Sequence, residues 1–205
     1  MRYMLPLAAL CIVFPAAYAS DIDITAGQDI FYYGDHLTYT VTVSEVTGNP
    51  AFLYIIDGKG TKSSAIPLDV SQLVTEHRAP FPFESTTYPE GIWMLEIHYG
   101  QSQAETDFIL ADSGQVVIPV WIKDAGRLWI NGADAQYYTS GLGFLVEQGI
   151  ISPDTPPVSD SAQEHIPEWV KVITSWWILD VITDDEYAEA IEYLIDRQVI
   201  RIARL

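Results

Sequence analysis

The stretch Leu37-Thr38-Tyr39-Thr40-Val41-Thr42-Val43-Ser44 decides the fold of the first half of this chain. Apolar side chains alternate in it with threonine and serine, which is the period of a strand with one buried and one solvated face. Further β-rich runs lie at 21–25, 52–56, 65–70, 92–99 and 106–110, and they are separated by turn residues such as Gly48-Asn49-Pro50. Short strands at this spacing, with no amphipathic helix between them, predict antiparallel pairing and an all-β immunoglobulin-like sandwich over residues 20–114.

Several of these runs also resemble a known module. The β-sandwich module common in exported proteins of ammonia-oxidising archaea has a similar order of motifs, namely Tyr33-Gly34-Asp35-x-Leu37, Val43-Ser44-Glu45-Val46, Ile55-Ile56-Asp57-x-Lys59-Gly60 and an ending like 91–108. Such modules resemble the macroglobulin and immunoglobulin-like sandwiches that serve as spacers and binding units. The resemblance covers residues 22–110 and implies a fold, but it implies no activity for particular residues.

Residues 1–19 have the three parts of a secretory signal peptide. Arg2 is the only charged residue, an apolar run extends from Tyr3 to Ala17, and Ala17-Tyr18-Ala19 is a small-x-small cleavage site. The run is shorter than the roughly 20 residues of a membrane span, which favours cleavage over a retained anchor. Cys11 follows Leu10 instead of a small residue, which argues against lipidation. We therefore expect a secreted or extracellular protein, free or associated with the cell envelope, with no integral membrane span after cleavage.

Composition limits the partners. The chain has 10 basic and 28 acidic residues and a formal net charge of −18; without residues 1–19, which contain Arg2 and Cys11, it has 9 basic residues, a charge of −19 and no cysteine. Its stability must then come from ordinary hydrophobic cores, without disulfides. The acidity argues against nucleic acid and anionic membrane surfaces, because their phosphates would repel the protein. Solubility explains this charge better than cation binding.

Residues 115–205 contain an internal repeat. Ile118-Pro119-Val120-Trp121-Ile122-Lys123 returns at an offset of 48 as Ile166-Pro167-Glu168-Trp169-Val170-Lys171, and Trp129 returns as Trp177. At an offset of 49, Tyr138, Leu145 and Ile151 return as Tyr187, Leu194 and Ile200. A repeat of this length predicts one supersecondary unit used twice. We expect a helical hairpin over 115–152, a proline-containing linker over 153–165 and a second hairpin over 166–205.

Apolar spacing predicts the helices and their buried faces. The expected faces are Trp121, Ala125 and Leu128, then Tyr138, Leu142 and Leu145, and in the second copy Trp169, Ile173 and Trp176, then Tyr187, Ile191 and Leu194. Trp121 and Trp169 should accordingly anchor the first helix of each hairpin in the core. Thr183-Asp184-Asp185-Glu186 predicts a capping box. Gly141 and Gly143 should weaken the second helix of the first copy. The expected fold class is an all-β sandwich followed by an all-α domain of two helical-hairpin repeats.

The helical repeats resemble a tryptophan-rich unit of the same archaeal secreted proteins. That unit has an Ile-Pro-x-Trp-(Ile/Val)-Lys opening, a Trp-Trp pair, an acidic turn and a final helix with a glycine exit. The second copy matches it in Trp176-Trp177, 183–187 and 193–195, and departs from it at Val181 and Gln198. The first copy has Leu128-Trp129 and no acidic turn. The phrase at 190–195 also resembles, over a short span, the last helix of S-layer-homology repeats.

The metal-binding residue types show no strong site. His36, His77, His98 and His165 occur singly, without the clustered spacing of zinc ligands. Asp180, Asp184, Asp185 and Glu186 are weak candidates for a cation such as calcium, but they lack the order of a helix–loop–helix calcium loop. Capping of a helix explains these acids better, because acids belong in its first turn. We predict no metal site and no cofactor.

No motif indicates catalysis. Gly58-Lys59-Gly60-Thr61 lacks the rest of a phosphate loop and is better explained as a hairpin turn. Gly141-Leu142-Gly143 lies in a helix, so it is no dinucleotide fingerprint. A Gly-x-Ser-x-Gly elbow is absent from the sequence, and no cysteine survives signal cleavage. Paired carboxylates stay open as an acid–base device, although nothing singles out a pair.

The adjacent Trp176 and Trp177 are the candidate contact residues. Neighbouring helical side chains point about 100° apart, so one of the two rings should be partly exposed. We expect a non-enzymatic extracellular or cell-envelope interaction or structural protein of unknown ligand, with an envelope or extracellular protein or glycan as partner. The alternative is an accessory or degenerate binding part of an exported hydrolase, which would bind peptide or glycan.

Overall fold

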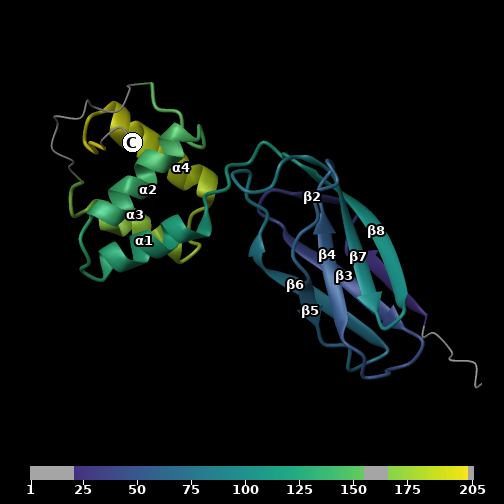
Figure 1. The fold of residues 1–205 in the computed structure, drawn as a ribbon. Coiled ribbons are helices and arrows are strands. Elements are labelled where there is room, and N and C mark those ends of the chain that lie inside the picture. Colours follow the sequence, from purple (N-terminus) through teal and green to yellow (C-terminus); the bar gives the residue numbers. More distant parts are fainter. Residues whose placement is uncertain (1–20, 155–165, 203–205) are drawn as a thin grey trace, which may run out of the picture.

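The computed structural model describes residues 21–154 and 166–202, which form eight β-strands and four α-helices. The strands come first and form a two-layered sandwich, and the helices form a second lobe beside one end of it (Figure 1). The predicted signal peptide at 1–19 and most of the predicted linker lie outside the described residues. In the described part no helix has both the length and the apolar character needed to cross a bilayer.

Two sheets make up the sandwich. The smaller has the order β1 (Ile22–Ala26), β3 (His36–Val43), β6 (Val74–Pro82), and the larger has the order β2 (Ile30–Tyr32), β8 (Ser102–Ala111), β7 (Gly91–Tyr99), β4 (Ala51–Ile56), β5 (Ile66–Leu68). The expectation of purely antiparallel pairing is wrong at one place, because the short β2 pairs with β8 in parallel. All other pairs of strands are antiparallel.

The core of the sandwich lies between the two sheets. The four apolar residues of β3 that alternate in the sequence, Leu37, Tyr39, Val41 and Val43, are all buried in it, as the alternation predicts. At the end nearest the helices the core is aromatic, since Phe31 lies edge-on to Phe83 at 5.7 Å and to Phe108 at 5.2 Å between ring centroids. Such edge-to-face contacts add to the stabilisation that burial of the rings provides.

The helical lobe consists of α1 (Val120–Ile130), α2 (Gln136–Glu147), α3 (Val170–Ile178) and α4 (Asp184–Asp196). Helix α1 packs against both α2 and α3, and α3 packs against α4. Buried residues from all four helices form one hydrophobic cluster. The faces expected for α2 and α4 are confirmed, because Tyr138, Leu142, Leu145, Tyr187, Ile191 and Leu194 all belong to that cluster.

Of the faces expected for α1 and α3, Ala125 is buried as predicted, whereas Leu128 and the three tryptophans are exposed. The centre of each buried face is displaced by one residue, a rotation of about 100°. The buried positions are Ile122, Ala125, Gly126 and Trp129 in α1 and Val170, Thr174 and Trp177 in α3. Trp121 and Trp169, expected as core anchors, are 46% and 51% exposed. The reason is the close approach of the two helices: a Cβ on Gly126 would lie 3.1 Å from the Thr174 Cγ2 atom. Only small residues allow this crossing, and they turn the large Trp121 and Trp169 outward.

Residues that repeat in the sequence make matching contacts in the two halves of the lobe. Trp129 stacks on Tyr138 at 4.8 Å, and Trp177 stacks on Tyr187 at 4.1 Å. The repeated lysines make reciprocal contacts between the halves. Lys123 of the first half lies 5.2 Å from the ring centroid of Trp177, and Lys171 of the second half lies 5.2 Å from that of Trp129. Each half therefore supplies the cation that covers the other half's tryptophan.

Candidate interaction surfaces

The acidic turn before α4 caps the helix and holds the chain that enters the lobe. Thr183 and Glu186 form the predicted capping box, with the Thr183 amide donating to Glu186 at 2.8 Å. Asp185 accepts a hydrogen bond from the amide of Val116 at 2.9 Å, and Asp184 accepts one from the amide of Ile118 at 2.8 Å. These carboxylates are therefore engaged by backbone donors, which explains their presence without a cation.

The remaining weak cation candidate, Asp180, is engaged by a cation of the protein itself. Its carboxylate lies 2.8 Å from the Lys123 ammonium group. Among the described residues no group of three or more His, Cys, Asp or Glu side chains is arranged to hold a metal ion. His36 bonds to the Ala79 carbonyl at 2.8 Å and His98 bonds to Glu96, whereas His165 lies outside the described residues. Asp180 and Asp184 both lie near the Lys123 ammonium group, at 2.8 Å and 3.8 Å, whereas His36 and His98 lie on strands of the sandwich.

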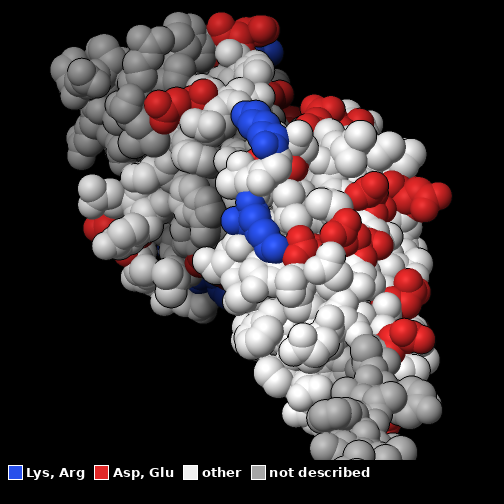
Figure 2. Space-filling view, turned by 45° about the vertical axis from the view of Figure 1, so that its right-hand side comes forward, with Lys and Arg blue, Asp and Glu red and all other residues white. Residues whose placement is uncertain are grey.

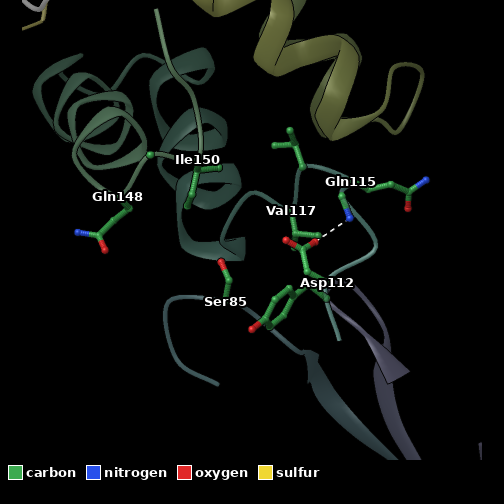
Figure 3. A pocket seen from close by; sticks show the side chains of 10 residues that line it. Ser85, Asp112, Gln115, Val117, Gln148 and Ile150 are labelled. Atoms are coloured by element: carbon green, nitrogen blue, oxygen red, sulfur yellow. Dashed lines mark hydrogen bonds between the residues drawn. The ribbon is translucent and has the colours of Figure 1, made fainter. Parts of the chain in front are cut away.

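A cleft lies where the sandwich meets the helical lobe (Figure 3). Its volume is about 210 Å³, and its lining combines Ser85 and Asp112 from the sandwich side with Gln148 and Ile150 from the helical side. Close by, the Glu84 carboxylate accepts a hydrogen bond from the amide of Val120, the first residue of α1, at 3.1 Å. A carboxylate of the sandwich thereby caps a helix of the second lobe.

The cleft is polar and carries negative charge. Tyr33 lies in its wall and donates a hydrogen bond to the Tyr88 carbonyl at 3.0 Å. Burial, followed by the nearby charges of Glu90 and Asp112, raises the pKa of the Tyr33 hydroxyl. One oxygen of Asp112 is held by the amide of Gly114 at 2.7 Å. The residues that line this cleft include no basic side chain, so the cleft does not suit an anionic ligand.

The strongest surface feature of the helical lobe is an apolar stripe along α3. Trp169, Val172, Trp176 and Leu179 follow a spacing of three and four residues, which places them on one helix face, and each is about half or more exposed. We name these four residues the α3 stripe. Of the two predicted contact residues, only Trp176, at 49% exposure, is available. Trp177 is fully buried under Lys123 and Tyr187, so its assignment as a contact residue is wrong.

A second exposed surface lies on the outer side of the smaller sheet. A groove of about 540 Å³ runs over β3 and β6 and is lined by Gly27, Thr38, Tyr39, Thr40, Glu76, His77 and Arg78. Beneath it, the His77 ring stacks on Tyr39 at 5.0 Å. Burial raises the pKa of Tyr39 to about 12 and lowers the pKa of His77. Sequence reasoning missed this surface because it predicted no strand over 74–82.

Comparison with known proteins gives neither a family nor a relative: no family model matches the chain, and no curated protein does. Among solved structures, the M1 domain from titin matches at 11% identity and a TM-score of 0.29, covering 47% of this chain and 96% of that chain. The amphioxus IgVJ-C2 molecule matches at 12% identity and 0.25, covering 44% and 42%. The PKD domain of an M14-like peptidase from a Thermoplasmatales archaeon matches at 15% and 0.25, covering 45% and 98%. Each of these three matches covers less than half of this chain.

Proposed function

We propose that this chain is a non-enzymatic extracellular or cell-envelope interaction protein that docks onto another protein through the α3 stripe. The sandwich acts as a spacer or recognition unit. In the helical lobe, α1 with α2 and α3 with α4 are two copies of one hairpin unit. Export with removal of residues 1–19 belongs to the same proposal, and it is supported by the charged, apolar and small-residue segments of that sequence.

The single observation that carries the proposal is the exposure of the α3 stripe. Helix α3 is apolar on nearly all sides, with Lys171 as its only charged residue. A helix of this kind is normally buried on all faces. Here one face packs on α1 and α4, while the opposite face presents two tryptophans and two aliphatic side chains to solvent. Contiguous exposed apolar residues with aromatic anchors are typical of protein–protein contact sites.

The charge of the chain indicates the chemistry of the partner. Figure 2 shows acidic side chains distributed over the visible face, with few basic ones between them. Two acids stand at the ends of the α3 stripe, because Glu168 precedes Trp169 and Asp180 follows Leu179. Each forms an ion pair with a lysine of the lobe, at 2.9 Å and 2.8 Å, but both acidic side chains are 81% exposed and can accept a second cation. A partner that offers an apolar groove rimmed by lysine and arginine complements both features.

The test measures binding of the purified chain to a cell-envelope fraction of the source organism by co-sedimentation. Trp176→Ser changes the α3 stripe, and Tyr193→Ser is the matched control, because Tyr193 is an aromatic residue of α4 with 58% exposure. We expect Trp176→Ser to lose at least about tenfold in affinity, as a central aromatic contact does, and Tyr193→Ser to bind like wild type.

Treating the envelope fraction separates the two kinds of partner. Loss of binding after protease digestion of the fraction supports a protein partner. Loss after periodate oxidation alone assigns the stripe to a glycan and contradicts our choice of partner. Equal affinities of Trp176→Ser and the wild type would show that the α3 stripe is not the docking site.

A further inference from the structure

Strand β6 lies at an edge of the smaller sheet. It pairs with β3 on one side, and no other strand of the described residues pairs with its second side. It is nine residues long, whereas natural edge strands are commonly short, twisted away or covered. Three apolar residues in and next to it, Leu73, Val74 and Phe81, are exposed. The strand therefore offers a template for pairing with another strand.

The register of β3 and β6 determines which backbone groups of β6 are free. The Val43 amide donates to the Leu73 carbonyl at 2.8 Å, and the register continues through Tyr39 opposite His77. Because successive residues of a strand direct their amide and carbonyl groups to opposite sides, Thr75 and His77 face β3. Val74, Glu76 and Arg78 therefore direct their backbone groups to the free edge.

Two prolines restrict how a second strand can pair there. The pairing of β6 with β3 is regular from Val74 to Arg78 and then shifts register between Thr38 and His36. Pro80 and Pro82 lie in this irregular half of the strand, and neither has an amide hydrogen to donate. A strand aligned with the second half of β6 would lose both donors. The open part of the edge is therefore 74–78.

The charged side chains of this open part are complementary to each other. The side chains of Glu76 and Arg78 are exposed on the outer face of the sheet and line the groove described above. Neither residue takes part in an ion pair within the described part of the chain. When two antiparallel copies of β6 meet about a twofold axis at His77, Glu76 of each copy stands directly opposite Arg78 of the other. Opposite charges in such cross-strand pairs stabilise a sheet.

We propose that two copies of this chain associate edge to edge through β6, forming a continuous six-stranded sheet with the order β1-β3-β6-β6-β3-β1. The interface is isologous: Glu76 of one copy pairs with Arg78 of the second copy, and the same pair recurs across the twofold axis. Only this register satisfies both charges and keeps the prolines at the ends of the paired segment. The α3 stripe takes no part in it and stays available for a different protein.

The experiment uses the full chain and its charge-reversal variants in sedimentation equilibrium over a concentration series. We expect a monomer–dimer equilibrium for the wild type. Arg78→Glu and Glu76→Arg each place like charges opposite one another at both pairs and should raise the dimer Kd about tenfold or more. The double variant Glu76→Arg/Arg78→Glu restores opposite charges in both pairs and should return the Kd to near the wild-type value. Lys59→Glu, in an exposed turn away from β6, is the control for a change of net charge.

Amide hydrogen exchange locates the interface independently. On raising the concentration of the wild type from below to above the dimer Kd, exchange should slow at the amides of Glu76 and Arg78. A chain that stays monomeric at all accessible concentrations overturns the proposal. So does a dimer that is unaffected by either single reversal, or one that the double variant fails to restore. A dimer disrupted instead by Trp176→Ser would assign the contact to the α3 stripe.

Discussion

Replacing Trp177 by alanine should destabilise the helical lobe far more than replacing Trp169. The Trp177 ring is fully buried, stacks on Tyr187 at 4.1 Å and donates from its indole nitrogen to Asp184 at 2.7 Å. Truncation of a buried large aromatic residue lowers the free energy of unfolding by about 3–5 kcal/mol. Because Trp169 is 51% exposed, Trp169→Ala should lower the free energy of unfolding by less than about 1 kcal/mol. Trp177→Phe keeps a ring and removes the hydrogen bond to a carboxylate, so an intermediate loss of about 1.5–3 kcal/mol is expected.

The assay is equilibrium unfolding of the full chain in urea, followed by far-ultraviolet circular dichroism at the helical signal. The sandwich contributes little there, so the transition reports the lobe of α1–α4. The buried face we describe for α3 is refuted if Trp169→Ala proves as destabilising as Trp177→Ala, or if Trp177→Ala stays within about 1 kcal/mol of the wild type.

Three further predictions concern other parts of the molecule. Gln198 has a φ of 56° after α4, where the repeated position is Gly149 with a φ of 69°, so Gln198→Gly should raise the unfolding free energy by up to about 1 kcal/mol in the same urea assay. Burial lowers the pKa of His77 from 6.5, so the unfolded chain binds the proton more readily than the folded chain does. The free energy of unfolding should therefore fall as pH drops below 6.5. In His77→Gln, the melting temperature should depend less on pH between pH 7 and 5. Burial raises the pKa of Tyr39 from 10.0 to about 12, so stability should fall as pH rises above 10, and Tyr39→Phe should lose that decline. A His77→Gln or Tyr39→Phe profile that matches the wild type would contradict the corresponding statement.

The amount of fold that the sequence predicts differs between strands for a physical reason. In β3 all inward residues are apolar and all outward residues are polar, so the period is unambiguous. In β6 the inward residues include Thr75 and His77, and Pro80 and Pro82 break the pattern of a strand. Prolines are tolerated there because β6 lies at an edge, a property of the assembled sheet that no local pattern records.

The helices show the same dependence on tertiary context. In α2 and α4 the spacing identified the buried face. In α3 the residues at 169, 173 and 176 and those at 170, 174 and 177 both form acceptable helical faces. The structure selects the second because Thr174 fits against Gly126, whereas the tryptophans of the first face are too large for that crossing. The same selection exposes the α3 stripe, so the residues Val172 and Leu179 could not be identified as surface contacts beforehand.

The reciprocal lysine contacts make the two halves of the helical lobe depend on each other. Lys123 covers the tryptophan of the second half and Lys171 covers that of the first, and the Tyr138 hydroxyl lies 3.0 Å from the Thr174 hydroxyl across the same junction. Neither half alone retains these contacts, so each half has only part of a core. Consider the chain divided between α2 and α3, so that one polypeptide ends after α2 and the other begins before α3. The two polypeptides should therefore bind each other in solution and together restore the helical signal. Separately, each should be largely unfolded in its helical segment, so this lobe is suited to a split reporter whose two pieces become helical only on meeting.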